Sequence, residues 1–340
     1  MFEKSVKIGA EYLAEKMNRK TLKCQICGNS GEFKVFEVQD YNRAGTTYFE
    51  YSICSYCGCM QIVSVPDNLS DYYGNSYYSF CLRTRNKVTG TFVHWLMEKR
   101  DIFEIIHKGY IGRIMHGFIP RPAYGVIGNY TKKSDAILDV GCGDGYLLYL
   151  LEKLGYKNLS GCDRFITQEA LNKNLNSKIK FIYGTIKECS EEYDLIMFHH
   201  SFEHIENPRE TMLRAYQKLR VGGGILISIP IAGSNVFRKF GKYWVQLDAP
   251  RHIFLHSIKS MNILVDELGL SIDRILFDSS AFQYIGSIQY SKGKDGNYRR
   301  TILGIFEYAI LAFSKYSKIA KRDNACGKGD QATFVLRKID

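Results

Sequence analysis

Short apolar runs alternate with amphipathic runs from residue 135 onward. Apolar runs of four to ten residues bounded by turn residues indicate buried strands, and the segments between them have the three-to-four-residue spacing of helices. Strands are predicted at 136–140, 159–163, 178–184, 193–200, 222–231, 270–277 and 332–338, and helices at 168–174, 208–219 and 257–268. This order predicts an α/β fold in which a parallel sheet carries helices on both faces.

The first 130 residues have a different pattern. Residues 1–20 interleave charged and apolar positions, which predicts a surface helix and not a secretion signal. Residues 33–41 and 46–54 alternate polar and apolar positions and predict two strands joined by a turn. Residues 86–129 predict two or three helices, interrupted at Pro120 and Pro122.

The first strand of the parallel sheet ends in a glycine-rich turn. Gly141, Gly143 and Gly145 stand at alternate positions, just before a predicted helix. Glycine lets the backbone turn sharply and approach a ligand, and the first amides of the helix point at the same place. Asp163 ends the second strand about 20 residues later, where a carboxylate can bind both hydroxyls of a ribose. The turn therefore predicts a nucleotide-like ligand; the alternative is a turn that needs glycine only for its geometry.

The spacing of the turn indicates which nucleotide to expect. Dinucleotide-binding turns favour G-x-G-x-x-G, but here Tyr146 occupies the last glycine position. The order acidic-x-G-x-G-x-G, from Asp139 to Gly145, resembles the first motif of the class I S-adenosylmethionine (SAM) methyltransferases. The resemblance covers about residues 129–340 and implies a Rossmann-like seven-stranded sheet whose last strand inserts antiparallel between the fifth and sixth. It also implies that Asp139, Gly141, Gly143, Gly145, Asp163, Gly184 and Thr185 bind SAM.

Two histidines follow strands at the edge where open α/β sheets bind ligands. His204 closes the segment HSFEH, which resembles the "EH" motif of the same family, and His252 lies on a loop expected to face the acceptor. Histidine accepts protons near neutral pH, so both are candidate catalytic bases, with His252 preferred. The alternative for His204 is a capping or core role. His199 and His200 are predicted to be packing residues at the end of the strand.

Two CxxC pairs lie in the amino-terminal part of the chain. Cys24, Cys27, Cys54 and Cys57 have the spacing of two zinc knuckles and predict a zinc ribbon. Four thiolates leave no open coordination position, so the Zn²⁺ is expected to be structural. A redox pair is the competing interpretation, and Cys59 could replace Cys57 as a ligand.

A zinc ribbon, a tyrosine-rich segment and a SAM domain also occur together in a narrower group. The chain resembles sugar C-methyltransferases of deoxysugar pathways and methyltransferases of bacterial surface-polysaccharide clusters. This resemblance implies that Arg251 and the tyrosines Tyr72, Tyr73, Tyr77 and Tyr78 contact a sugar acceptor. In those sugar enzymes an acidic residue precedes the late histidine, whereas Arg251 does so here, so O-methylation is at least as well supported as C-methylation.

The charge, hydropathy and cysteine content of the chain indicate its partners and its compartment. The 340 residues carry a formal net charge of +11, which favours an anionic partner such as a nucleotide sugar, a nucleic acid or a membrane surface. No apolar run reaches the ~18 residues of a membrane span, and ten cysteines without an export signal indicate a cytoplasmic protein. Residues 298–319 combine an apolar body with basic ends, which predicts a lid helix, a homodimer helix or a helix at the inner membrane face.

These observations predict a SAM-dependent methyltransferase that acts on a small polar acceptor, first of all a nucleotide-linked or lipid-linked sugar. An RNA methyltransferase is the alternative, although the basic residues are dispersed and no N/D-P-P-Y motif follows the fourth strand. A binding protein that kept the fold is the second alternative. The predicted parts are an N-terminal helix at 1–20, a zinc ribbon at 21–66, a tyrosine-rich and helical cover at 67–130, and a methyltransferase domain at 131–340 with an amphipathic helical insertion at 298–320.

Overall fold

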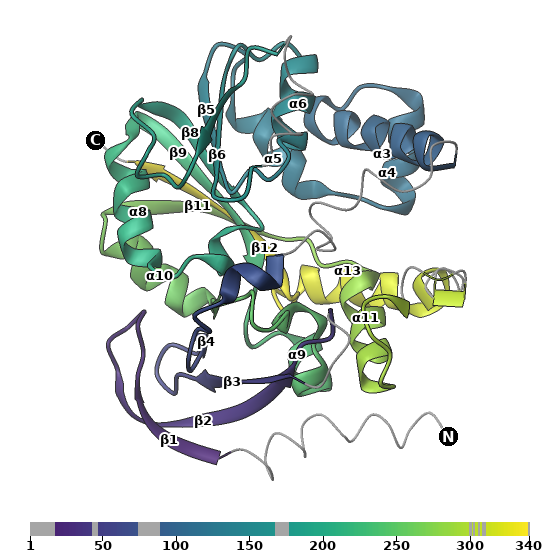
Figure 1. Cartoon of the computed structure of the whole chain (residues 1–340). Helices are drawn as coiled ribbons and strands as arrows, with labels where there is room; N and C mark the ends of the chain where they lie inside the picture. Colours follow the sequence, from purple (N-terminus) through teal and green to yellow (C-terminus); the bar gives the residue numbers. More distant parts are fainter. Residues whose placement is uncertain are drawn as a thin grey trace.

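The computed structural model describes residues 18–42, 47–73, 89–166, 177–298, 301, 303–304, 307 and 311–338. Their strands form two sheets, one of seven strands in the order β11-β12-β9-β8-β5-β6-β7 and one of five in the order β1-β2-β3-β4-β10. The larger sheet occupies the upper left of Figure 1, and the smaller sheet lies below it.

The seven-stranded sheet confirms the predicted Rossmann-like fold. Its strands are β5 (Ala136–Val140), β6 (Asn158–Asp163), β7 (Lys180–Tyr183), β8 (Tyr193–His199), β9 (Leu219–Pro230), β11 (Leu270–Phe277) and β12 (Gln331–Lys338). β5 pairs parallel with β6 and β8, whereas β12 runs antiparallel between β9 and β11. The position implied for the last strand by the class I resemblance is therefore correct.

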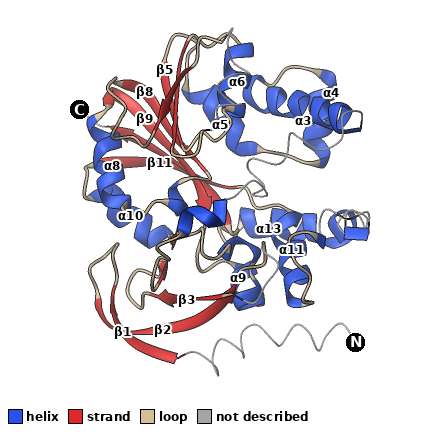
Figure 2. Cartoon of the chain, in the orientation of Figure 1, coloured by secondary structure: helices blue, strands red, loops and turns tan. Residues whose placement is uncertain are grey.

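Helices cover both faces of this sheet (Figure 2). Neighbouring residues of β5 point to opposite sides: Ile137 joins a core with α6 (Tyr146–Lys153), and Leu138 joins the core that contains residues of α8 (Pro208–Gln217) and α10 (Ile258–Asp266). This alternation follows from the two-residue period of a strand. The predicted helix at 168–174 lies outside the described residues.

The predicted helical cover consists of α3 (Thr89–Ile106), α4 (Tyr110–Phe118) and α5 (Pro122–Tyr130). Pro122 stands in the first turn of α5, where its missing N–H costs no helical hydrogen bond. α3 packs against both α4 and α5, and Ile105 reaches the core on the α6 side of the sheet.

The smaller sheet is completed by a strand from the distant part of the chain. β1 (Asn18–Lys23), β2 (Ser30–Gln39), β3 (Tyr48–Ile53) and β4 (Met60–Ile62) form an antiparallel meander, and β10 (Phe254–Leu255) adds to the β4 edge. η1 (Leu69–Tyr73) follows the meander. The predicted strands at 33–41 and 46–54 correspond to β2 and β3. The smaller sheet is thus not a self-contained unit.

The described part of the predicted helix at 298–319 continues past its expected end. It includes η6 (Ala312–Tyr316) and α13 (Ser317–Ala325), which pack against α11 (Ala281–Ser291). The Tyr284 and Tyr316 rings stack with their centroids 5.4 Å apart. None of the helices among the described residues is both long and apolar enough to span a bilayer.

Candidate functional site

The backbone of the glycine turn after β5 leaves no room for a side chain at two of its three glycines. Gly141, Gly143 and Gly145 all have positive φ angles, of 77°, 55° and 76°. A Cβ at Gly141 would lie 2.4 Å from the Cβ of Ser201, and one at Gly145 would lie 2.6 Å from the Phe181 ring. The turn therefore requires glycine at these two positions, and its backbone stays accessible to a ligand.

Asp163 organises the turn from the end of β6. Its carboxylate accepts hydrogen bonds from the N–H of Gly143 at 2.9 Å and from the N–H of Phe165 at 2.7 Å. Burial raises the pKa of Asp163, and these two N–H groups oppose that shift. Asp163, the residue predicted to bind a ribose, lines a cavity at the carboxyl ends of the strands.

Asp139 lies in β5, just before the turn. It is buried, and its Oδ1 atom has no hydrogen-bond partner among the described residues. Burial, followed by the nearby charge of Asp163, raises its pKa to about 7. A buried carboxylate that lacks a partner is unfavourable unless a cationic group approaches it, and the sulfonium and ammonium groups of SAM are cationic. The orphaned oxygen thus suits a cationic ligand, although Asp139 itself does not line the cavity that its neighbours Val140 and Gly141 border.

The loop after β7 forms another side of the same region. The Gly184 N–H donates to the carbonyl of Asp163 at 3.0 Å, and the Thr185 hydroxyl donates to the Glu188 carboxylate at 2.8 Å. Gly184 and Thr185 both line the cavity, which agrees with their predicted location. We call Gly141, Gly143, Asp163, Gly184 and Thr185 the cofactor wall.

These residues border a cavity of about 410 Å³ at the carboxyl ends of β5, β6, β7 and β8. This volume is within the range of small-molecule sites. Residues of η1 and of the segment after β8 also line it, among them Tyr73, His200 and His204, which we call the acceptor wall. The cavity thus lies at the edge where open α/β sheets bind ligands.

His204 is held in a defined tautomer. Its Nδ1 atom lies 2.8 Å from the carbonyl oxygen of Arg251, and the Tyr73 hydroxyl lies 3.1 Å from the same nitrogen. Since a carbonyl can only accept, Nδ1 carries the proton and donates to it. Nε2 is therefore the ring nitrogen that is left to accept a proton.

His252 lies behind His204 and does not line the cavity. It is only 3% exposed, and the two ring centroids are 4.7 Å apart. Its Nδ1 donates to the carbonyl of Gln246 at 2.7 Å. Burial, followed by the charge of His204, lowers the pKa of His252 to about 4, so the ring is neutral at pH 7.

Two buried carboxylates accompany the histidines. Glu203 and Asp248 lie 3.9 and 3.8 Å from the Nε2 atom of His252. Burial opposes ionisation of both, but the histidines around Glu203 and the Arg251 guanidinium beside Asp248 hold each pKa near 2. Ligand atoms of Glu203, His204 and His252 lie within 4.8 Å of one another, so this cluster has donors suited either to proton transfer or to a divalent ion.

Arg251 is not placed as an exposed acceptor-binding residue. It is 1% exposed, and its guanidinium is 2.9 Å from Asp40 and 2.8 Å from Asp248. The ion pairs attach the end of β2 to the loop that carries His252. The prediction of a substrate contact for Arg251 is therefore replaced by an internal role, because burial of this cation requires the two carboxylates.

The predicted tyrosines separate into different environments. Tyr73 reaches the cavity, where its ring stacks on Phe165 with centroids 5.0 Å apart. Tyr72 instead packs edge-on against Phe49 of the smaller sheet, 5.6 Å away. Tyr77 and Tyr78 lie outside the described residues.

His200 is one of several cavity residues that the sequence did not identify, together with charged residues such as Arg164 and Lys187. It was predicted to pack at the end of a strand, but it lines the cavity and has a φ of 54°. A non-glycine residue in this conformation is uncommon and accompanies functional sites. Its Nδ1 lies 3.6 Å from Glu203, three residues later, and this His-x-x-Glu spacing is the signal that could have identified it.

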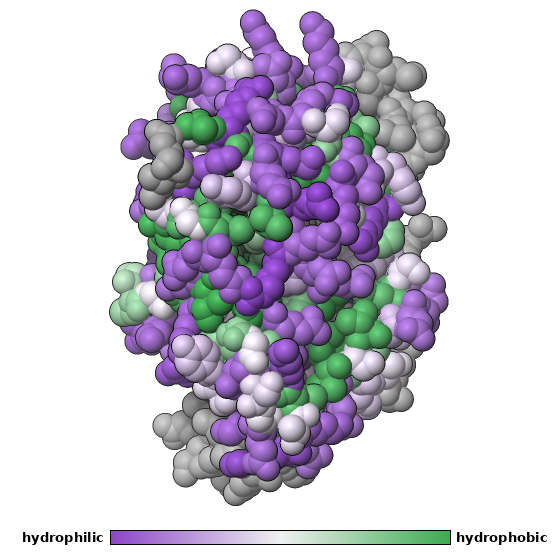
Figure 3. All heavy atoms as spheres, turned by 90° about the vertical axis from the view of Figure 1, so that its left-hand side faces the viewer, coloured by the Kyte–Doolittle hydropathy of each residue, from purple (hydrophilic) through white to green (hydrophobic). Residues whose placement is uncertain are grey.

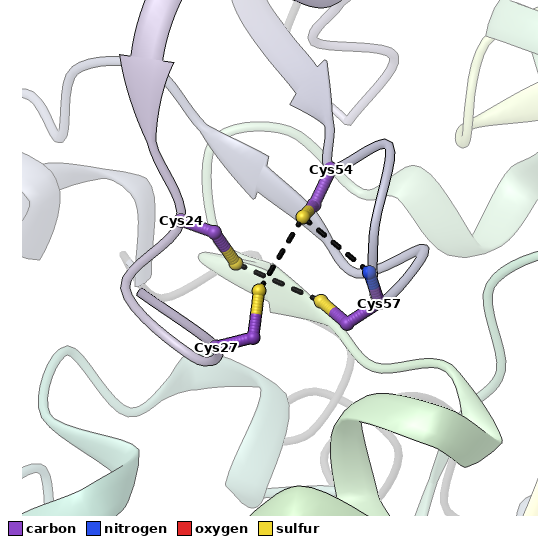
Figure 4. Close-up of side chains that lie close together, drawn as sticks. All are labelled: Cys24, Cys27, Cys54 and Cys57. Carbon is purple, nitrogen blue, oxygen red and sulfur yellow. Dashed lines mark hydrogen bonds between the residues drawn. The ribbon is translucent and has the colours of Figure 1, made fainter. Parts of the chain in front are cut away.

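The four predicted zinc ligands converge between two knuckles (Figure 4). The Sγ atoms of Cys24 and Cys57 are 3.7 Å apart, and those of Cys27 and Cys54 are 3.5 Å apart. A tetrahedron with Zn–S bonds of about 2.3 Å has edges of roughly 3.8 Å, so the cluster fits a zinc ion. Cys59 lies outside this ligand cluster and donates to the carbonyl of Met60.

Comparison with known proteins agrees with the fold and the turn. A family model described as a methyltransferase domain matches residues 119–275, which include the glycine turn and both histidines. Together with the strand order, this match shows that the chain contains a class I SAM-dependent methyltransferase domain.

Individual relatives match only part of the chain. A malonyl-[acyl-carrier protein] O-methyltransferase of Priestia megaterium is 31% identical over 29% of this chain and 38% of its own length. A ubiquinone biosynthesis O-methyltransferase of Rickettsia bellii is 32% identical over 29% of this chain and 44% of its own length. A SAM-dependent methyltransferase structure from Mesorhizobium loti has a TM-score of 0.41 at 12% identity and covers 63% of this chain and 97% of its own. The chain thus spans less than half the length of these curated relatives.

Proposed function

We propose that this protein transfers the methyl group of SAM to a hydroxyl group of a small polar acceptor, a sugar in the first instance. The observation that carries the proposal is one cavity with two unlike walls. The cofactor wall offers bare backbone and Asp163, and the acceptor wall offers an imidazole with an available lone pair. Such a cavity suits a reaction between a bound nucleotide-like methyl donor and a second, protic molecule.

SAM supplies an electrophilic methyl group on its sulfonium. Asp163 would bind the ribose hydroxyls, and the cationic end of the cofactor would favour ionisation of the buried Asp139. The protein's main contribution is to align the acceptor oxygen with the methyl carbon and the sulfur, which provides much of the rate enhancement. The C–S bond breaks as the C–O bond forms, and S-adenosylhomocysteine leaves.

The acceptor hydroxyl must also lose its proton. His204 is the better candidate base, because the residue lines the cavity and its Nδ1 donates to the Arg251 carbonyl, which leaves Nε2 as the nitrogen that can accept a proton. His252 is buried behind it, and a pKa of about 4 makes it a weak base at neutral pH. We therefore assign proton acceptance to His204 Nε2 and a positioning role to His252, which reverses the preference drawn from the sequence.

A sugar acceptor is supported by the aromatic and polar composition of the acceptor wall. The Tyr73 ring is part of an aromatic stack with Phe165, and its hydroxyl lies at the cavity beside His204. Aromatic rings pack against the apolar faces of sugars while nearby polar groups bind their hydroxyls. Because Arg251 precedes His252 in the sequence, where the sugar C-methyltransferases have an acidic residue, O-methylation is at least as well supported as C-methylation.

The proposal is tested by calorimetry and by transfer of a labelled methyl group. SAM is expected to bind with micromolar affinity, and label from methyl-labelled SAM is expected to appear in one member of a panel of nucleotide sugars and lipid-linked sugars. Absence of SAM binding would contradict the enzyme assignment. Transfer to RNA but to no small acceptor would support the RNA methyltransferase alternative.

We further propose that Cys24, Cys27, Cys54 and Cys57 hold one structural Zn²⁺. Elemental analysis of the purified protein is expected to give one zinc per chain. Cys54→Ser is expected to lose the metal, whereas Cys326→Ser, at an exposed thiol distant in sequence, is expected to keep it. Full zinc content in the Cys54→Ser variant would exclude the proposed ligand set.

A further inference from the structure

The apolar stripe of α4 faces outward. Tyr110, Ile114 and Phe118 follow one another at helical spacing and are 80%, 44% and 62% exposed. Ile111, on the same side of the helix, is exposed as well. A helix in a globular protein normally turns such a stripe toward the core, so the orientation of α4 is unusual.

The orientation is fixed by close packing on the other side of α4. Gly112 is buried against α3, and a Cβ there would lie 2.3 Å from the carbonyl oxygen of Lys99. His116, one turn later, forms an ion-pair contact with the buried Glu104 of α3 at 2.8 Å. A rotation of α4 that buried its apolar stripe would break two contacts, the close approach of Gly112 to α3 and the contact of His116 with Glu104.

α3 extends the same kind of surface. Phe92 and Trp95, in its first half, are both exposed, and their rings stack with centroids 5.9 Å apart. Residues 92–119 contain eight of the seventeen large hydrophobic side chains that are exposed among the described residues. We call these eight, namely Phe92, Val93, Trp95, Tyr110, Ile111, Ile114, Phe118 and Ile119, the α3–α4 face.

Two basic residues beside this face have no acidic partner among the described residues. Lys108 and Arg113 are exposed and form no ion pair with a described residue. The neighbouring acidic residues are engaged within the protein: Glu98 pairs with Lys153 at 2.9 Å, and Glu104 with His116. The apolar stripe is therefore flanked by cations that lack a counter-charge among the described residues.

We propose that the α3–α4 face docks on an anionic lipid bilayer, with the stripe of α4 inserted into the interface. Aromatic and aliphatic side chains beside unpaired basic groups form the combination that interfacial helices use on anionic membranes. A second copy of the chain fits less well. A two-fold dimer through the stripe would bring Lys108 and Arg113 of both copies together, where like charges repel.

The opposite side of the molecule supplies a comparison surface. Figure 3, viewed from the left of Figure 1, shows mostly hydrophilic side chains, with apolar ones in smaller groups. Leu213 of α8 and Val221 of β9 are exposed residues outside the α3–α4 face, 42% and 72% exposed. They provide matched positions for removal of apolar side chains that are not part of the proposed docking face.

Vesicle flotation tests the proposal with the full chain. The wild-type protein is expected to float with vesicles that contain phosphatidylglycerol, and to bind phosphatidylcholine vesicles more weakly. The double variant I114S/F118S is expected to lose about tenfold or more of its lipid affinity. The matched double variant L213S/V221S is expected to bind like the wild type, and thermal unfolding shows whether each variant is folded.

Three results would overturn docking through this face. They are failure of the wild type to bind anionic vesicles, unchanged binding of I114S/F118S, or a dimer in light scattering that this variant dissociates. Membrane docking would make a lipid-linked sugar the favoured acceptor, and this part of the inference depends on the proposed function. SAM calorimetry tests the proposed function separately, because it needs no vesicles.

Discussion

The two walls of the cavity are built by different means. The cofactor wall consists mainly of backbone and one carboxylate, and its members come from two consecutive strand ends and the loop after a third. The acceptor wall consists of side chains whose positions depend on segments far apart in the sequence: the His204 ring bonds to the Arg251 carbonyl and contacts the Tyr73 hydroxyl. One wall is therefore local in sequence, and the other depends on how the two sheets pack together.

The two walls are therefore expected to affect different steps, the cofactor wall the binding of SAM and the acceptor wall the transfer of the methyl group. Loss of a local backbone feature should damage the turn and the cofactor site, whereas loss of an acceptor-wall side chain should leave cofactor binding intact. Single substitutions in and around the two walls can test whether SAM binding and turnover are affected independently.

His204→Ala is expected to lower turnover by about 10²- to 10⁴-fold, because the acceptor proton would lose its base. The dissociation constant for SAM should stay close to that of the wild type. Steady-state methyl transfer and calorimetry provide the two readouts. His252→Ala is the comparison variant and should lose less turnover; an equal or larger loss there would assign the base to His252.

Two buried groups that belong to neither wall, Asp139 and His252, should change the stability with pH in opposite directions. Between pH 3.8 and about 7 the folded protein keeps a proton on Asp139 that the unfolded chain has released, so this group reduces stability as pH rises. Between about pH 4 and 6.5 the unfolded chain protonates His252 and the folded protein does not, so this group increases stability as pH rises.

These contributions are about 4 kcal/mol for Asp139 and about 3 kcal/mol for His252 over their full ranges. Urea unfolding of Asp139→Asn and His252→Gln across pH 4–8 measures them as differences from the wild type. The Asn variant should gain stability relative to the wild type as pH rises, and the Gln variant should lose it. Slopes of the same sign for both variants would contradict the opposed pKa shifts.

Gly141→Ala and Gly143→Ala form a matched pair within the turn. Both variants place a side chain at a positive φ, which costs about 1–2 kcal/mol. Only the Cβ at position 141 would overlap Ser201, whereas no protein atom lies within 4 Å of a Cβ at position 143. Gly141→Ala should therefore lose an additional 1–3 kcal/mol or so in the free energy of unfolding. Equal losses would show that the overlap is relieved by movement of the turn.

Asp163→Ala is expected to weaken SAM binding by about 1–3 kcal/mol, because charge-assisted hydrogen bonds to the ribose are lost. Calorimetry measures this change directly. Asp144→Ala is the control, since Asp144 belongs to the same turn but does not line the cavity. A similar loss in both variants would indicate a general disturbance of the turn.

Local features of the sequence were sufficient to predict the large sheet and the cofactor wall. The glycine turn, Asp163 and the pair Gly184–Thr185 each follow directly from a strand that its apolar residues identify. The four cysteines were likewise predictable, because knuckle spacing alone brings each pair together, and the structure places the two knuckles in contact. Whether zinc occupies them stays a prediction.

The acceptor wall could not be predicted in the same detail. Arg251 depends on Asp40 and the His252 carbonyl accepts from the Tyr51 hydroxyl, and both partners are more than 200 residues away in the chain. Burial converts Arg251 from an apparent substrate contact into an internal cation, and it also makes His252 a weak base. No periodicity or spacing reports such long-range burial, so the sequence alone did not show that Arg251 and His252 are buried while His204 lines the cavity.

The pairing of β10 with β4 has a consequence for protein engineering. Chimeras between related enzymes are usually cut at a single point in the linear chain. Here a donor segment that ends near residue 66 would arrive without the edge partner that residues 254–255 provide. An exchange meant to transfer acceptor preference should therefore carry two pieces, the amino-terminal meander and the distant loop that completes it.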